Sequence, residues 1–153
     1  DSLIKLNIET TTIDQVSTTR LIDLIKTEIN KIEPNIIYIP FLYDIHTDHQ
    51  NVANAMLSFS KWFRYPFIKQ INMYETISET NFNFKNKQFN PNLFINISDY
   101  MEKKKEIAEI YSSEMKNHPF PRSIRALESN AIMRGSASGY EYAEAFQILI
   151  KRQ

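Results

Sequence analysis

The stretch NIIYIPFLYDIHTDHQNV, residues 35–52, decides the fold that we expect for this chain. Residues 35–41 form a compact apolar run, which is typical of a strand buried on both faces in a parallel sheet. A helix is predicted before it, capped by Ser17 or Thr18 and closed by Pro34. Its apolar residues recur at helical spacing: Leu21, Leu24, Ile25, Ile29 and Ile32. With a further predicted strand at residues 3–8, the pattern indicates a right-handed βαβ unit.

The remainder of the chain alternates between helical and strand patterns, without repeats or linkers. We predict helices over residues 49–63, 98–115 and 122–133, and strands over residues 67–74, 93–97 and 141–150. Residues 77–92 read as a long loop or active-site flap. In the helix over 98–115, Ile107, Ile110 and Tyr111 are expected to face inward, and the lysines at 103–105 to face solvent. A single α/β domain spanning residues 1–153 follows from this order.

Composition narrows the range of functions. The 153 residues include 18 Lys plus Arg and 18 Asp plus Glu, so no net field favours nucleic acid or an anionic membrane. No apolar run approaches the roughly 20 residues that span a bilayer, and no signal peptide is recognisable. We therefore expect a cytoplasmic protein with no transmembrane segment and no nucleic-acid partner. Because the chain has no cysteine, thiolate metal sites and disulfides are excluded.

The histidine loop that follows the strand at residues 35–41 is the strongest candidate site. His46 and His49 lie beyond the carboxyl end of that strand, where open α/β sheets bind ligands. A catalytic zinc has three protein ligands and an open position for water, and Asp48 could orient a histidine ring as a supporting carboxylate. The alternative is a polar loop in which Asp48 caps the next helix.

Four sequence blocks together resemble one known family. HTDHQNV at 46–52 resembles the H-x-D-H-x-x-V block of the LmbE-like (PIG-L) zinc-dependent N-acetyl-sugar deacetylases. Three further blocks follow in the family's order: MYETISET at 73–80, FNPNLFINIS at 89–98, and FPRSIRALESNAIMRGSASGYEYAEAF at 120–146. The resemblance implies a Rossmann-like three-layer sandwich with a mostly parallel sheet, here without its first strands.

The resemblance also implies roles for the histidine loop. His49 corresponds to the family's zinc-binding histidine. His46 corresponds to the histidine that faces the substrate carbonyl, where it stabilises the oxyanion or protonates the leaving amine. Asp48 would orient His46 and raise its pKa. Zinc itself is an inference from the family, because such a ligand set would also accept iron(II) or cobalt(II).

One family block has no counterpart in this chain. The P-H-P-D-D-E-like run supplies the other zinc ligands and the general base, and an R-x-x-E segment follows it; neither occurs here. His118 is expected in a surface loop and does not substitute for them. We therefore expect the C-terminal portion of a deacetylase, inactive alone. Either an N-terminal part is missing, which Asp1 as the first residue favours, or the chain is a remnant that lost its chemistry.

Three further residues are candidates for substrate binding. Arg134 could bind a substrate hydroxyl or carboxylate, or meet carbonyls at a helix end. Glu144 could hold a sugar hydroxyl or pair with Arg134. Glu75 lies at the end of a predicted strand, at the rim of the expected site.

The resemblance thus implies a zinc-dependent deacetylase that removes the N-acetyl group of an amino-sugar conjugate, with this chain supplying part of the site. The alternative is a non-catalytic glycan-binding or assembly module that lost its metal. A homo-oligomer or a complementing N-terminal chain is the expected protein partner.

Overall fold

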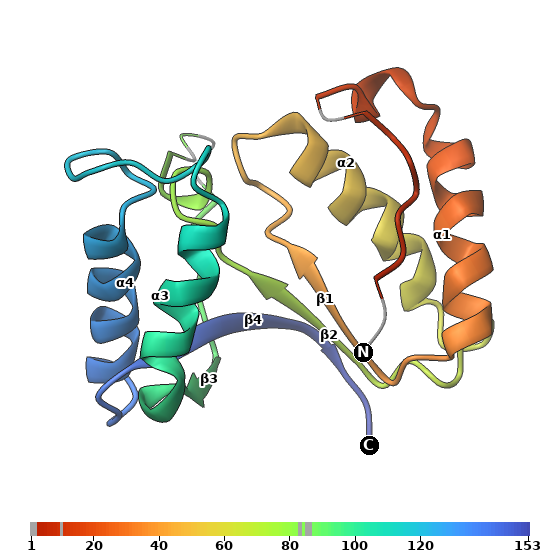
Figure 1. Ribbon diagram of the computed structural model, residues 1–153. Helices are drawn as coiled ribbons and strands as arrows, with labels where there is room; N and C mark the ends of the chain where they lie inside the picture. The colour runs from red at the N-terminus through yellow and green to blue at the C-terminus, as the bar shows by residue number, and fades with distance from the viewer. Residues whose placement is uncertain (1–2, 10, 83, 85–86) are drawn as a thin grey trace.

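The computed structural model describes residues 3–9, 11–82, 84 and 87–153 (Figure 1). Short 3₁₀ turns separate the regular elements. The helices are α1 (Thr18–Ile32), α2 (Thr47–Met56), α3 (Met101–Ile110) and α4 (Ile124–Ser136). The strands are β1 (Ile36–Pro40), β2 (Gln70–Tyr74), β3 (Leu93–Asn96) and β4 (Ala143–Lys151). The predicted α/β class is therefore confirmed.

The four described strands form one mixed sheet in the order β1-β2-β4-β3. β1 and β2 are parallel, with α2 between them in sequence, whereas β4 runs antiparallel to both β2 and β3. The prediction of a mostly parallel sheet is therefore wrong. Polar and apolar residues alternate at the start of β4, which is typical of an antiparallel strand with one solvated face. The direction of the strand depends on the end of the sheet at which α4 returns the chain, and the residues of β4 do not specify this.

Helix α1 confirms its predicted bounds and its cap. The Ser17 hydroxyl accepts a hydrogen bond from the Arg20 backbone N–H at 3.2 Å. The helix ends at Glu33, whose φ of 48° is the left-handed conformation that commonly terminates helices. The backbone N–H groups of the first helical turn have no partner within the helix. The Ser17 hydroxyl supplies one for Arg20, as the sequence predicts.

The predicted strand at residues 3–8 does not form. These residues have no regular structure, and Asn7 has a φ of 53°, which interrupts an extended backbone. The predicted βαβ unit that began here is therefore wrong. The segment instead lies along α1 and α2, where Leu6 and Ile8 line a shallow cavity with Leu21 and Val52.

Strand β1 forms as predicted, but one of its faces is open. Ile37 and Ile39 are buried, whereas Ile36 and Tyr38 on the other face are 46% and 50% exposed. Among the described strands β1 lies at the edge of the sheet, with β2 as its neighbour. The expectation of burial on both faces is therefore wrong for the described residues.

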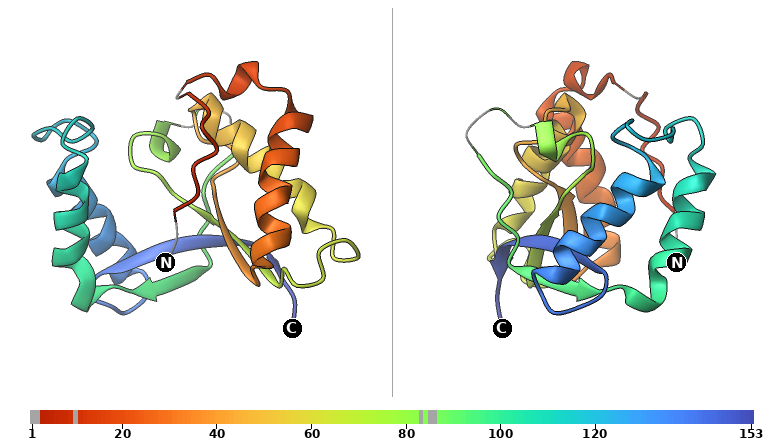
Figure 2. Two further views of the ribbon diagram at one scale, coloured as in Figure 1. Left: turned by 45° about the vertical axis from the view of Figure 1, so that its right-hand side comes forward. Right: turned by 90° about the vertical axis from the view of Figure 1, so that its left-hand side faces the viewer.

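The main core lies between the α1–α2 layer and the β1–β2 half of the sheet. Its fully buried side chains include Ile39, Phe41, Ala53, Phe59, Ile68 and Ile71. A smaller cluster of Ile97, Met101 and Ala131 lies beneath α3 and α4. Figures 1 and 2 show the two helix pairs at opposite ends of the sheet. The main core fixes the strand end from which the histidine loop leaves.

Helix α3 is shorter than predicted and turned the other way. Residues 98–100 form a 3₁₀ turn, and the helix ends at Ile110. The residues expected inside, Ile107, Ile110 and Tyr111, are 47%, 77% and 62% exposed. Lys104 and Lys105 instead face the protein, where their ammonium groups bond Glu144 and Glu128. Lys104 and Lys105 therefore lie on the same face of the helix as the buried Met101.

The other predicted elements are present with shifted ends. α2 begins two residues before its predicted start and passes into a 3₁₀ turn, Leu57–Ser60, instead of reaching residue 63. α4 continues through Arg134 and Gly135, beyond its predicted end at residue 133. The predicted loop over residues 77–92 contains the short 3₁₀ turn Thr80–Phe82, and its residues 83, 85 and 86 lie outside the described part of the chain.

Candidate functional site

The candidate site lies where the chain leaves β1 and enters α2. His46 is the N-cap of α2, and its ring Nδ1 accepts a hydrogen bond from the Asp48 backbone N–H at 3.1 Å. Because α2 then turns the chain through its first residues, the His46 and His49 rings stack with centroids 5.2 Å apart and planes at 26°. The structure thus brings the two predicted histidines together.

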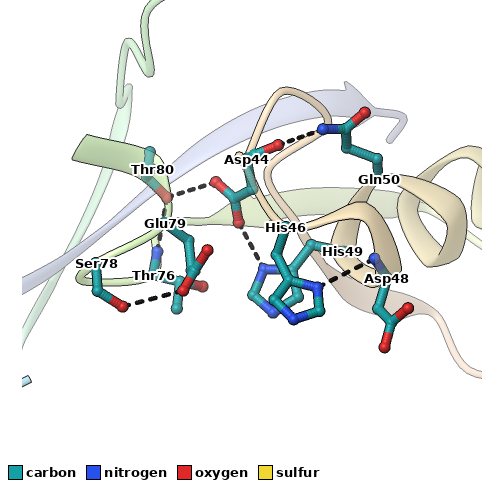
Figure 3. Close-up of polar contacts among 9 residues, drawn as sticks. All are labelled: Asp44, His46, Asp48, His49, Gln50, Thr76, Ser78, Glu79 and Thr80. Atoms are coloured by element: carbon teal, nitrogen blue, oxygen red, sulfur yellow. Dashed lines mark hydrogen bonds and ion pairs between the residues drawn. The ribbon is translucent and has the colours of Figure 1, made fainter. Parts of the chain in front are cut away.

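Asp44 is the carboxylate that supports this pair, and the sequence interpretation missed it. Its side chain is fully buried, and its Oδ2 lies 2.8 Å from Nδ1 of His49. Its Oδ1 accepts a hydrogen bond from the Thr80 hydroxyl at 2.6 Å, and its backbone oxygen accepts one from the Gln50 amide at 2.6 Å (Figure 3). The sequence signal that could have identified Asp44 is its place two residues before His46.

Asp48 has a different task from the one expected. Its carboxylate Oδ2 accepts a hydrogen bond from the Thr11 backbone N–H at 2.9 Å, which ties the N-terminal segment to α2. Figure 3 shows this carboxylate pointing away from the His46 ring. The contact between the two residues comes from the Asp48 amide, so its carboxylate is not the group that orients His46. The other oxygen, Oδ1, is buried without a partner among the described residues.

A second loop, after β2, closes the site from the other side. The Thr80 hydroxyl that donates to Asp44 also accepts a hydrogen bond from the Thr76 backbone N–H at 2.8 Å. The Ile45 backbone N–H donates to the Glu79 carbonyl at 3.4 Å. The loops that follow two parallel strands are thus joined at their carboxyl ends, as expected for a ligand-binding crevice.

The local charges favour a protonated His49. The hydrogen bond to Asp44 raises the pKa of His49, and burial of the ring opposes this effect. The nearby carboxylates of Asp44, Glu79 and Asp48 raise it further. The acidic surroundings therefore stabilise the imidazolium form of His49.

A pocket of about 640 Å³ lies on the open face of the sheet, opposite the main core. Its walls include Tyr38 and Phe146, whose rings meet edge to face at 5.0 Å. Two predicted substrate-binding residues, Glu75 and Glu144, also line it. His46 and His49 are not among its lining residues, although Thr76 belongs to both the pocket and the loop that supports Asp44.

The three residues predicted to bind substrate are engaged in ion pairs. Arg134 donates to both carboxylate oxygens of Glu75, at 2.8 and 2.6 Å. Glu144 instead accepts a hydrogen bond from Lys104 at 2.5 Å. The predicted alternative in which Glu144 pairs with Arg134 is therefore wrong, because β4 places Glu144 next to α3.

The described residues contain no group of three or more His, Asp or Glu side chains that could hold a metal ion. The Nδ1 atom of His49 is hydrogen-bonded to the Asp44 carboxylate, so this residue has the arrangement of a single zinc-binding histidine. His118 is exposed in the loop before α4, as predicted, and lies at a different cavity. Over the described part of the chain, no helix is long and apolar enough to cross a bilayer.

Two solved structures resemble this one. The conserved protein TT1542 from Thermus thermophilus matches with a TM-score of 0.63 and 18% identity, covering 82% of this chain and 56% of that one. The N,N'-diacetylchitobiose deacetylase from Pyrococcus horikoshii, complexed with its inhibitor MPG, matches with a TM-score of 0.62 and 21% identity, covering 88% and 52%. No protein-family model and no curated protein matches the sequence.

These likenesses establish the fold. The chain has an α/β fold of the type found in a sugar deacetylase, and it spans little more than half the length of the two similar structures.

Proposed function

We propose that this chain forms part of a zinc-dependent hydrolase that removes the N-acetyl group from an amino-sugar conjugate. The observation that carries the proposal is the stacked pair His46 and His49, held at the carboxyl end of β1 with a buried carboxylate behind it. The shared fold of a diacetylchitobiose deacetylase supports it. The two histidines belong to HTDHQNV, residues 46–52, which resembles the H-x-D-H-x-x-V block of the LmbE-like family.

In this proposal His49 is one metal ligand, and the remaining ligands come from polypeptide outside these residues. Bound zinc would polarise the acetamide carbonyl and lower the pKa of a water molecule. β1 has a neighbouring strand, β2, on one side only among the described strands, so its other edge offers a place for that polypeptide to pack. A preceding segment or a separate chain that covers this edge would bring further ligands next to the histidine loop.

His46 is proposed as the group that acts on the substrate oxygen. A backbone N–H can only donate, so Nδ1 of His46 accepts from the Asp48 amide, and the proton of the neutral ring sits on Nε2. Nε2–H is then a hydrogen-bond donor for a carbonyl oxygen that gains negative charge during hydrolysis. The cap of α2 therefore fixes both the place and the tautomer of this donor.

The pocket on the open face is proposed to hold the sugar conjugate. Tyr38 and Phe146 offer an aromatic wall on which a sugar ring can stack. Glu75 and Glu144 line the pocket and provide polar groups for its hydroxyls, although each already has a protein partner; Arg134 is the partner of Glu75. The role of Glu75 and Glu144 is then to orient the substrate through carboxylate oxygens that can accept further hydrogen bonds, whereas Arg134 can only donate.

The competing function is a glycan-binding or assembly module, which the incomplete ligand set of the described residues favours. Replacing His49 with Ala separates the two functions in the complete protein. The deacetylase requires loss of bound zinc, measured by metal analysis, and loss of acetate release from N-acetyl amino-sugar conjugates. The module requires unchanged glycan binding. His118→Ala is the matched control, because this exposed histidine lies in another loop and should leave zinc and activity unchanged.

A further inference from the structure

We infer that Asp44 is a positioning residue, which fixes the His49 ring so that its Nε2 lone pair faces outward, with Thr80 holding Asp44 in turn. The role of that lone pair, metal binding, rests on the proposed function. The position of the ring itself is a property of this chain alone.

The chemistry of the contact decides the tautomer. An ionised carboxylate can only accept hydrogen bonds, so the 2.8 Å contact between Oδ2 of Asp44 and Nδ1 of His49 requires the proton on Nδ1. The neutral ring then has its lone pair on Nε2. Metal-binding histidines commonly have this arrangement, in which the other ring nitrogen donates to a carboxylate.

The carboxylate is itself held in place. Asp44 is fully buried, and both of its side-chain oxygens are used, one by His49 and one by the Thr80 hydroxyl at 2.6 Å. Thr80 is fixed by the Thr76 backbone N–H at 2.8 Å. The orientation of His49 therefore depends on the loop after β2 as well as on its own loop.

The stacked rings thus differ in what they present. His46 accepts at Nδ1 and presents an N–H, whereas His49 donates at Nδ1 and presents a lone pair. The Asp48 backbone amide makes His46 a hydrogen-bond donor at Nε2, and the buried Asp44 carboxylate makes His49 an acceptor at Nε2.

The test is the tautomer of His49 by ¹⁵N–¹³C correlation NMR of the metal-free chain, at a pH where the ring is neutral. The signals are assigned with His49→Gln. We expect the Nδ1–H form in the wild type and the Nε2–H form, which unrestrained imidazole prefers in water, in Asp44→Ala. Asp44→Asn should keep the Nδ1–H form, because its amide oxygen can still accept while the Thr80 hydroxyl turns to accept from the amide nitrogen.

An Nε2–H form in the wild type would overturn the inference, and this spectrum needs no variant to fold. So would an unchanged Nδ1–H form in a folded Asp44→Ala. Zn²⁺ is then titrated into the wild type, and we expect it to perturb Nε2 of His49. If the tautomers are as expected but Zn²⁺ leaves His49 unperturbed, even in the complete protein, the positioning holds and the proposed zinc function fails. If Zn²⁺ binds but through Nδ1, the positioning fails and the function survives.

Discussion

Glu75 and Arg134 form a two-pronged ion pair that joins the carboxyl end of β2 to the last turn of α4. The guanidinium donates to both carboxylate oxygens, at 2.8 and 2.6 Å, and Asn130 donates to one of them at 3.1 Å. Both side chains are largely buried, at 10% and 17% exposure. The pair therefore links the end of the sheet that carries the candidate site to the helix layer that covers the pocket.

Replacing Arg134 with Met should destabilise the fold. Glu75 would keep its contact with Asn130 but lose two charge-assisted hydrogen bonds in a partly buried place. We expect a loss of about 2 kcal/mol in the free energy of unfolding, measured by urea denaturation. Arg125→Met is the matched control on an exposed part of the same helix, with an expected change within about 0.5 kcal/mol. Equal effects of the two variants would contradict the structural role of the pair.

Gly135→Ala should destabilise the protein although alanine favours helices. Gly135 lies within α4, and an added Cβ would lie 2.5 Å from the Tyr140 carbonyl oxygen and 2.7 Å from that of Glu141. Helix propensity alone predicts a gain of about 1 kcal/mol. We expect instead a loss of roughly 1–3 kcal/mol from the backbone shift, seen as a lower thermal midpoint. Ser136→Ala, next to it and exposed, should have little effect.

The orientation of α3 can be tested with a pair of substitutions. Met101 is 1% exposed, whereas Ile110 is 77% exposed. We expect Met101→Ala to cost about 2–5 kcal/mol and Ile110→Ala less than about 0.5 kcal/mol in unfolding free energy. The orientation predicted from the sequence would make Ile110→Ala strongly destabilising, so chemical denaturation of both variants distinguishes the two arrangements.

The contact between Asp44 and His49 predicts a pH dependence of stability. The folded state raises the pKa of His49, mainly through the hydrogen bond to Asp44, so it binds more protons than the unfolded chain above about pH 6.5. This contribution is complete below the unfolded pKa and is lost as pH rises through the folded pKa. Asp44→Asn should lower the pKa of His49 and flatten this fall. NMR titration of His49 and urea unfolding at several pH values measure both effects; an unchanged slope in Asp44→Asn would contradict the coupling.

Much of the architecture could be predicted from local patterns. The cap at Ser17 and the break at Pro34 defined α1 at both ends. The apolar runs located β1 to β4 to within a few residues, whereas the run at residues 3–8 forms no strand. The candidate site was predicted for the same reason, because a polar loop after an apolar strand is recognisable without a structure. Local hydrogen bonds and hydrophobic spacing are properties of neighbouring residues, so the sequence by itself determined them.

The tertiary structure decided what depends on distant partners. β4 passes between β2 and β3 because α4 returns the chain antiparallel to both, which no residue of β4 specifies. Lys104 faces the protein in α3, where its ammonium group contacts Glu144, 40 residues away in sequence. The carboxylate of Asp44 contacts the His49 ring and is held by Thr80 from the next loop, whereas the carboxylate of Asp48 accepts from Thr11. Charges and buried hydrogen bonds select their partners in space, and the sequence alone does not state which residues meet there.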